Sequence, residues 1–446
     1  MRAPAPIASA DADTTSPAKR RPPLGRPFAM LWAAAGFSNL ADGIARIAVP
    51  LIATTLTHDP LAISVLAALA YVPWLVFGIP SGIIVDRFDR RRVMALANVI
   101  RTATALVLAV LTVSGGMTLW ALFAATLVFG LGETLFDNAT NAVIPSVVQR
   151  SGLERANSRV QAAQIAIDGF VAAPIGGVLF AVSLVLPLWV GAAGYLVPIA
   201  LALLLPLSAA RPLLDDPPAG PSRDLADDAQ PTAAEAFRWL WRHRYLRKMV
   251  VLGIVVAPAL AFAQAATILL FLDRLGVPEA SIGLVTAGVG AGALLGAVVA
   301  PWCVTRFGRG PSMFAGLAVG GAGMIATGLA PSAALAVATF GIGALAVSVW
   351  NVPWASLRQQ LVPHAMMGRV IAITRTFSWG LTPLATLLGG LVARVDLGLP
   401  FVIGGAVTIG ATLVSARLII AGTRDADADA SAPDAPQSPE NSSSTS

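Results

Sequence analysis

Between two long apolar segments of the chain lies a short charged stretch, Asp86-Arg87-Phe88-Asp89-Arg90. A similar stretch, Thr305-Arg306-Phe307-Gly308-Arg309, follows another apolar segment about 219 positions later. A second pair of stretches has nearly the same offset, because Val143-Ile144-Pro145 corresponds to Leu361-Val362-Pro363. Two repeats at one offset predict that the chain consists of two related halves.

Apolar residues dominate the rest of the chain. Of the 446 residues, 56% are hydrophobic and 12% are charged, whereas soluble domains carry roughly 25% charged residues. One crossing of a bilayer needs roughly 20 apolar residues, so this length allows about a dozen crossings. The composition excludes a soluble protein and predicts an all-α membrane protein.

Twelve apolar segments can be delimited, six on each side of a polar linker. They run over residues 28–56, 61–85, 93–113, 119–144, 160–179, 185–207, 249–272, 282–304, 313–329, 333–354, 370–392 and 401–420. We expect twelve transmembrane helices in two pseudo-symmetric six-helix bundles, related by an axis normal to the membrane. The first of these segments has no cleavage site after a short apolar core, and we expect a signal anchor.

This division predicts five parts of the chain. They are a cytoplasmic tail at 1–26, a six-helix bundle at 27–209, a cytoplasmic linker at 210–248, a second six-helix bundle at 249–420 and a tail at 421–446. The last part is rich in Asp, Ala, Ser and Pro and cannot bury apolar surface, so we expect it to be disordered.

Basic residues gather in every second loop, which marks the cytoplasmic side of a membrane protein. The loop and tail residues on that side are Arg20, Arg21, Arg87, Arg90, Arg91, Arg92, Arg150, Arg155, Arg306, Arg309, Arg358 and Arg369. The opposite loops carry only Arg274 and Arg394, each close to an acid, Asp273 or Asp396. We therefore expect both termini in the cytoplasm.

The linker contains a predicted helix. Thr232 and Glu235 have the spacing of a capping box at a helix start. Phe237, Leu240 and Trp241 then fall on one face, with basic residues around them. The pattern predicts an amphipathic helix on the anionic inner leaflet, with a regulatory docking site as the alternative.

The charged stretch resembles the hallmark loop of the major facilitator superfamily, between its second and third membrane helices. The matching residues are Gly82, Asp86, Arg87, Arg90 and Arg91, with a degenerate second copy at Arg306 and Arg309. Asp89 stands where the family usually has glycine, which puts the tight turn of the loop in question. The resemblance implies the major facilitator fold, secondary transport by alternating access, and a gating role for these seven residues.

Four shorter stretches make the chain similar to the bacterial branch that holds the enterobactin exporter and the macrolide and multidrug efflux pumps. They are residues 37–42, 144–145, 237–246 and 368–370. An antiporter element of that superfamily is matched in part by Ala173-Pro174-Ile175-Gly176-Gly177. The resemblance implies a place in the bacterial cell (inner) membrane and efflux of a small amphipathic compound, such as a drug or a siderophore.

Ionisable residues within apolar segments are costly and usually face partners or a watery cavity. In the N-terminal half they are Asp42, Arg46, Arg101, Glu133, Asp137 and Asp168. We expect Arg101 to neutralise one of Glu133 and Asp137, while their mutual repulsion makes the other protonatable. Asp42, Glu133, Asp137 and Asp168 are therefore candidates for proton coupling. Two structural alternatives stay open: a local ion pair between Asp42 and Arg46 four residues apart, and a charge cluster that only locks the helices together.

Small and aromatic residues supply further candidates. The glycine spacing at Gly288, Gly292 and Gly296, and at Gly78 and Gly82, predicts close helix packing. Trp74, Trp350 and Trp354 are weaker candidates for the lining of a substrate cavity, because aromatic residues in membrane helices more often face lipid or core.

The expected partners are a small-molecule substrate, protons and membrane lipids, for a protein that acts as a monomer. We expect no cofactor, no metal, no nucleic acid and no catalytic residue. Proton-coupled uptake by the same fold is the nearer alternative to efflux. An integral membrane enzyme is the more distant one, since Asp42-Gly43 and Ala45-Arg46 only faintly match a phosphotransferase motif and the further aspartates that would bind a metal are missing.

Overall fold

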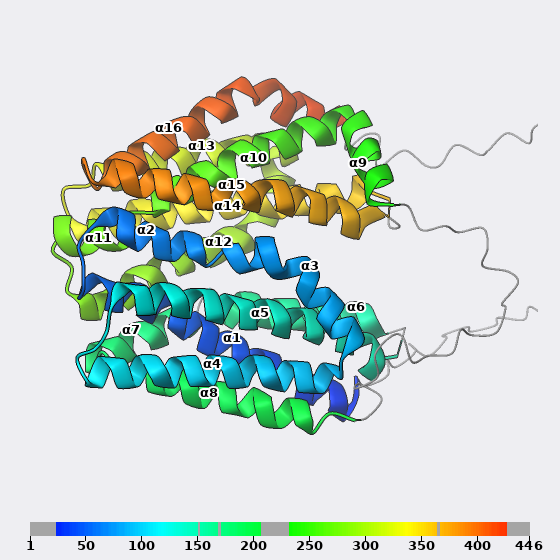
Figure 1. Ribbon diagram of the computed structural model, residues 1–446. Helices are drawn as coiled ribbons and strands as arrows, with labels where there is room; N and C mark the ends of the chain where they lie inside the picture. Colours follow the sequence, from blue (N-terminus) through cyan, green and yellow to red (C-terminus); the bar gives the residue numbers. More distant parts are fainter. Residues whose placement is uncertain (1–23, 150–151, 168–170, 207–231, 364–365, 426–446) are drawn as a thin grey trace, which may run out of the picture.

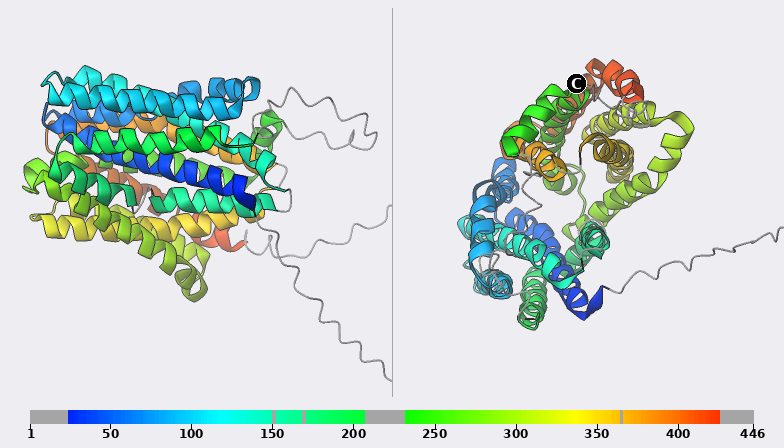
Figure 2. Two further views of the ribbon diagram at one scale, coloured as in Figure 1. Left: turned by 90° about the horizontal axis from the view of Figure 1, so that it is seen from below. Right: turned by 90° about the vertical axis from the view of Figure 1, so that its right-hand side faces the viewer.

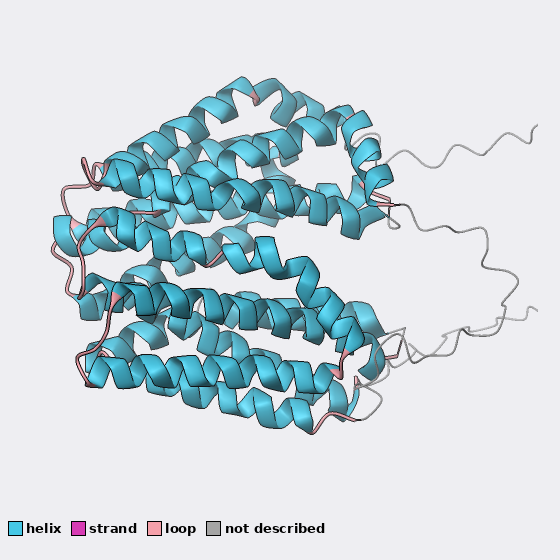
Figure 3. Ribbon diagram, viewed as in Figure 1, coloured by secondary structure: helices cyan, strands magenta, loops and turns pink. Residues whose placement is uncertain are grey.

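The computed structural model describes residues 24–149, 152–167, 171–206, 232–363 and 366–425, and the fold is given for these residues alone. Every regular element among them is a helix, and none is a strand (Figure 3). The helices before the linker are α1 (Gly25–Thr54), α2 (Pro60–Leu69), α3 (Val72–Arg87), α4 (Arg90–Val113), α5 (Leu119–Val147), α6 (Leu153–Ala166), α7 (Ala172–Val182) and α8 (Leu186–Leu203). The later helices are α9 (Ala233–Arg242), α10 (Arg244–Gln264), α11 (Thr267–Leu269), α12 (Ile282–Phe307), α13 (Arg309–Gly328), α14 (Ala333–Leu361), α15 (Met367–Ala393) and α16 (Leu399–Val414).

Long apolar helices make this a multi-pass membrane protein. Among the described residues, eight helices have the length and composition to cross a membrane. A ninth crossing is obtained if Leu399–Val414 and Leu418–Asp425, which are bent by 63° relative to each other, form one span. The number twelve stays a prediction, while the all-α membrane architecture is confirmed.

The helices form two groups. In the first, α4 packs on α5 and α8, and α1 packs on α5, α7 and α8. In the second, α14 packs on α12 and α13, and α10 packs on α15 and α16. Figure 1 shows the two groups one above the other, and Figure 2 shows that the helices of both run roughly parallel. The membrane helix that follows the polar linker, α10, thus belongs to the second group, as the repeats predict.

Several predicted segments are broken rather than continuous helices. The segment at 61–85 is divided into α2 and α3 at Ala70 and Tyr71. Pro73 lies in the first turn of α3, where its missing N–H and its fixed backbone angle fit a helix start and not a helix interior. The segment at 249–272 runs through α10 and α11 into a π-helical turn at Leu270–Arg274.

The two groups meet at the end of the bundle that lies opposite the linker. There α2 packs along α15, and α7 packs on α12. Glycines permit both contacts at backbone distance, because a Cβ on Gly390 would overlap Ser64 and a Cβ on Gly177 would overlap the backbone of Gly283. The molecule is therefore closed at this end.

The glycine pattern was predicted correctly for one helix and wrongly for another. Gly292 and Gly296 of α12 lie directly against the backbone of Gly341 and Leu345 of α14. In contrast, a Cβ on Gly78 or Gly82 of α3 would meet no atom of the described residues within 4 Å. Neither position therefore requires glycine for close packing in this conformation, and the carbonyl oxygen of Gly78 accepts from Asn138 Nδ2 of α5 at 3.3 Å.

The linker helix is confirmed as α9. Thr232 Oγ1 accepts from the Glu235 backbone N–H at 3.2 Å, and the Glu235 carboxylate accepts from the Thr232 N–H at 2.6 Å, which forms the predicted capping box. Its apolar face does not simply meet lipid, because Leu240 is buried against Val250 and Val370 of the second group. Trp241 stays half exposed. The apolar face of α9, which was expected to lie on the membrane, is thus partly packed against the second group of helices and partly exposed.

Candidate functional site

The hallmark loop is the first part of the candidate site. In this loop Asp89 replaces the glycine that is usual in the family, and the structure gives a reason. Asp89 is the residue before α4, and its Oδ1 accepts from the backbone N–H groups of Arg91 at 3.0 Å and Arg92 at 3.4 Å. Aspartate is among the best residues for this capping position. Its backbone has φ −57°, so no left-handed conformation is required and the glycine of the family is dispensable here.

Two arginines of the loop donate hydrogen bonds to backbone carbonyl oxygens within the first group of helices. The buried Arg90 donates from Nη1 to the carbonyl oxygen of Ala142 at 3.0 Å, on α5. Arg91 donates from Nη1 to the carbonyl oxygen of Leu205 at 2.9 Å, after α8. Asp86 and Arg87 are exposed at the end of α3. These bonds tie α4, α5 and α8 together at the linker end.

The second copy of the loop follows the same plan with fewer contacts. Arg309 donates from Nη1 to Gln360 Oε1 at 2.7 Å and so links α13 to α14. Arg306 is exposed, and its guanidinium lies 6.0 Å from the ring centre of Phe307. The described contacts of both loops therefore stay inside their own groups of helices, at the end where the groups are not joined.

A buried charge cluster lies deeper, between α1, α4 and α8. Its centre is Arg101 of α4, whose side chain is 0% exposed. Its Nη1 atom lies 3.2 Å from Asp42 Oδ2, and the Asp42 side chain is 8% exposed. Tyr195 of α8 donates from its hydroxyl to Asp42 Oδ1 at 2.6 Å. Asp42 is thus held by a cation and a hydroxyl group from two other helices.

Polar neighbours extend the cluster along α1 and α4. Arg101 Nη1 also donates to Ser38 Oγ at 2.7 Å and to Asn98 Oδ1 at 3.2 Å. Ser38 precedes Asp42 by four residues, and Asn98 precedes Arg101 by three, so each pair shares a helix face. The local helix geometry therefore presents two polar side chains from each helix to the other.

Gly132 of α5 makes room for the guanidinium. A Cβ at this position would lie 2.8 Å from both Cγ and Nε of Arg101. Aromatic rings line the rest of the space, with the guanidinium 5.6 Å from the ring centre of Phe136 and 5.4 Å from that of Tyr195. Nε and Nη2 of Arg101 are buried without a hydrogen-bond partner among the described residues. The hydrogen bonds of the cation are consequently made through Nη1, and Asp42 is the acid that it contacts there.

A second, more open pair joins α1 to α5. Arg46 Nη2 lies 3.4 Å from Glu133 Oε1, with the two side chains 53% and 23% exposed. The expected pairing was therefore wrong in its partners: Arg101 contacts Asp42, and Arg46 contacts Glu133. The spacing along one helix favoured Asp42 with Arg46, but the packing of α1 against α4 and α8 presents Asp42 to Arg101 instead.

Two predicted acids need separate mention. Asp137 lies half buried on α5, one helical turn after Glu133. Asp168 lies outside the described residues. The structure thus brings together Asp42 and Arg101, and separately Arg46 and Glu133, out of the six predicted charges.

Sequence reasoning missed Tyr195, Ser38 and Asn98. A signal was available for Tyr195, because the chain has only three tyrosines and this one lies within an apolar segment. The other two were detectable by their three- and four-residue spacing from Arg101 and Asp42.

The family model of the Major Facilitator Superfamily matches residues 31–385 of the chain. The chain belongs to the Major Facilitator Superfamily. This match covers the charge cluster and extends through the second group of helices into α15, and it agrees with the resemblance seen in the hallmark loop.

Relatives of this major facilitator chain include transporters named for efflux. Multidrug efflux pump Tap of Mycolicibacterium fortuitum is 25% identical over 415 residues, which cover 88% of this chain and 96% of that protein. Macrolide efflux protein A of Streptococcus pyogenes is 26% identical over 155 residues. That alignment covers 35% of this chain and only 38% of the macrolide protein.

A solved structure supports the major facilitator fold. The bacterial homologue of the iron transporter ferroportin, in an inward-facing state, has a TM-score of 0.65 and 18% identity, and the match covers 88% of this chain and 98% of that one. The likeness concerns the fold, since the identity is low.

Two of the three predicted tryptophans belong to the second group of helices, and the third lies on α3. Trp350 and Trp354 of α14 stack with ring centres 6.3 Å apart. Trp350 is buried in a core formed with Met249, Met313 and other apolar residues of the second group. Trp74 is half buried on α3. Trp350 is thus first a packing residue, and a role for the three tryptophans in substrate binding stays a prediction.

Proposed function

We propose that this major facilitator protein is a proton-coupled efflux transporter for a small amphipathic compound, built from transport units at 27–209 and 249–420. The buried contact of Asp42 with Arg101 and Tyr195 is the observation that carries the proposal. An acid at this depth costs free energy unless it is paired, and intramembrane acids in transporters commonly belong to proton relays.

The chemistry follows from the pairing. Ionised Asp42 accepts from the Tyr195 hydroxyl and offsets the charge of Arg101. Protonation of Asp42 removes that charge balance, and the bonds between α1, α4 and α8 weaken together. A proton bound at one residue therefore changes the relative stability of two arrangements of these helices, which is the requirement for coupling.

A route to this acid is supported by the second pair. The half-exposed Arg46 and the partly exposed Glu133 lie on the same helices, α1 and α5, that enclose the buried cluster. Glu133 is our candidate for the group that exchanges protons with water before Asp42.

The names of relatives support the direction of transport, since Multidrug efflux pump Tap of Mycolicibacterium fortuitum aligns over 88% of this chain. The two groups meet at the end opposite the linker through α2 with α15 and α7 with α12, which supports a substrate path that is open at the linker end. The arginine bias assigns that end to the cytoplasm. A compound would enter from the cytoplasm, and alternating access would require the joined end to separate.

Transport into inside-out vesicles tests the proposal. With full-length protein and an imposed proton gradient, ethidium should accumulate with wild-type protein and should not with Asp42→Asn. Glu279→Gln removes an exposed acid outside the cluster and should transport normally. Accumulation by Asp42→Asn at the wild-type rate would contradict the coupling role, and ethidium movement in the same direction as the protons would establish uptake instead.

A further inference from the structure

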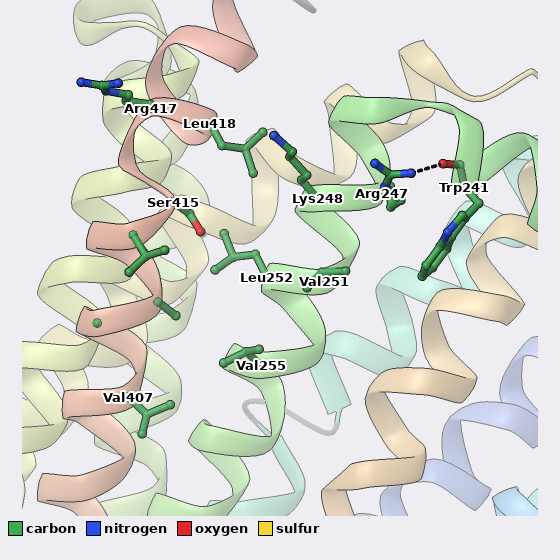
Figure 4. A pocket seen from close by; sticks show the side chains of 13 residues that line it. Trp241, Arg247, Lys248, Val251, Leu252, Val255, Val407, Ser415, Arg417 and Leu418 are labelled. Atoms are coloured by element: carbon green, nitrogen blue, oxygen red, sulfur yellow. Dashed lines mark hydrogen bonds between the residues drawn. The ribbon is translucent and has the colours of Figure 1, made fainter.

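A groove lies on the outer side of the second group of helices, between α10 and α16 (Figure 4). Its volume is 770 Å³. Among the described residues, thirteen line it, and none of these thirteen is acidic. They include Arg247 and Lys248 near the start of α10, and Arg417 after α16. The groove therefore combines a basic end with a long apolar wall.

The basic end is partly fixed in place. Arg247 donates from Nη1 to the carbonyl oxygen of Trp241 at 2.9 Å, and its guanidinium lies 5.9 Å from the centre of that indole. A guanidinium has five N–H donors, so this one bond leaves donors for a ligand. Lys248 and Arg417 are exposed on either side of the groove. Three cations thus lie at one end of the groove, with no acid among the described residues that line it.

The apolar wall faces away from the protein core. Val251, Val255 and Val407 are 46%, 41% and 43% exposed, and Val414 is 90% exposed. Side chains of this kind on a membrane helix contact acyl chains. Gly410 leaves a gap between them, since a Cβ there would meet no atom of the described residues within 4 Å.

The apolar wall of the groove fits within one leaflet. Val407 and Val414 are seven residues apart on α16, which is about 10 Å along the helix, and half of the hydrocarbon core is about 15 Å thick. The 63° bend between Leu399–Val414 and Leu418–Asp425 carries the chain sideways at the basic end. The basic end therefore lies at headgroup depth when the valines lie among acyl chains.

We propose that this groove binds one anionic glycerophospholipid of the leaflet on the linker side. Its phosphate contacts Arg247, Lys248 and Arg417, and an acyl chain lies over the valines and Gly410. Basic pockets between membrane helices are suited to anionic headgroups. The three cations would repel a cationic amphipathic ligand. The apolar wall favours a lipid over free phosphate, because phosphate has no acyl chain to cover the valines. The lipid would brace α10, which directly follows the linker helix α9, against the bent end of α16.

Binding can be measured with the purified full-length chain in detergent. Phosphatidylglycerol is titrated, and the bound lipid is counted by native mass spectrometry, with phosphatidylcholine and inorganic phosphate in parallel. One phosphatidylglycerol should be retained per chain, and neither of the other two at the same concentration. Equal retention of phosphatidylcholine, or saturation of the site by phosphate alone, would overturn the proposal.

Substitutions locate the site. Each of Arg247→Gln, Lys248→Gln and Arg417→Gln should weaken phosphatidylglycerol binding about fivefold, and the triple variant about a hundredfold. Arg244→Gln removes the same charge from an exposed position outside the groove and should bind within about twofold of wild type. Wild-type affinity of the triple variant would overturn the proposal.

A steric variant tests the apolar wall without touching a charge. Gly410→Leu fills the groove from a position where a Cβ meets no described atom, so the chain should fold and lose the bound lipid. Ala406→Leu adds similar bulk at an exposed position of the same helix outside the groove and should retain it. Equal lipid retention by the two variants would exclude the groove as the binding site.

Discussion

Asp59, just before α2, and Arg394, just after α15, form an ion pair that joins the two groups of helices. Arg394 Nε donates to Asp59 Oδ1 at 2.8 Å. His58 Nδ1 lies 3.0 Å from Asp273 Oδ1 and makes a second contact between the groups. Both contacts lie at the joined end, so they exist only while that end is closed. They belong to one of the two states that alternating access requires.

Loss of the Asp59–Arg394 pair should shift the protein toward the state that is open at this end. Asp59→Asn should raise the population of that state a few-fold, because the contact is exposed and screened. The charge swap Asp59→Arg with Arg394→Asp should restore the wild-type distribution. Spin-label distances between Ser114 and Ala334, two exposed positions at this end on different groups, report the change in a Cys303→Ser background. A longer distance in the swap than in Asp59→Asn would contradict a direct pair.

Acid should have the same effect as Asp59→Asn. The hydrogen bond from Arg394 is the main reason that the pKa of Asp59 lies below its ordinary value of 3.8. A carboxyl with a lowered pKa in the closed state stabilises that state above its ordinary pKa, and the stabilisation is lost as the pH falls through the lowered value. In a His58→Gln background, which removes the histidine contact at this end, the same spin-label distance should stay constant from pH 7 to about pH 5 and lengthen below about pH 4. Asp59→Asn should not show the part of the transition that depends on this carboxyl.

Substitution of Arg101 alone should lower the free energy of unfolding more than substitution of Arg101 and Asp42 together. Arg101→Gln leaves a buried carboxylate without its cation, a loss of about 3–5 kcal/mol. The double variant Arg101→Gln with Asp42→Asn leaves no uncompensated charge and should recover part of that loss. Thermal unfolding in detergent measures both variants against Asp42→Asn. Additive effects of the two single substitutions would show that the residues do not interact.

Gly132→Ala should displace Arg101 and disturb the same cluster. The added Cβ would lie 2.8 Å from two Arg101 side-chain atoms, and overpacking of this kind costs about 1–3 kcal/mol. Gly78→Ala is the matched control, since its Cβ meets no described atom within 4 Å. The control should be neutral or slightly stabilising in the same unfolding assay. Equal stability of the two alanine variants would mean that Arg101 can move without cost.

Much of the architecture could be predicted because it depends on local sequence. The apolar segments predict the membrane helices, since a bilayer accepts few polar side chains. The similarity of the stretches 86–90 and 305–309 predicts two halves of the chain. The spacing of Thr232 and Glu235 predicts the start of α9. Each of these patterns depends on residues close in sequence or on one fixed offset, so no tertiary contact is needed to read it.

The pairing of charges was decided by the tertiary structure alone. The sequence identifies Asp42, Arg46, Arg101 and Glu133 as charges inside apolar segments, and their cost in a bilayer requires that they find partners. Which partner each finds depends on the rotation of α1, α4, α5 and α8 about their own axes and on the depth at which they pack. That arrangement is set by many weak apolar contacts between helices far apart in the chain, and no short stretch of sequence encodes it. The same is true of Asp59 and Arg394, which are joined only because the two groups of helices close at one end.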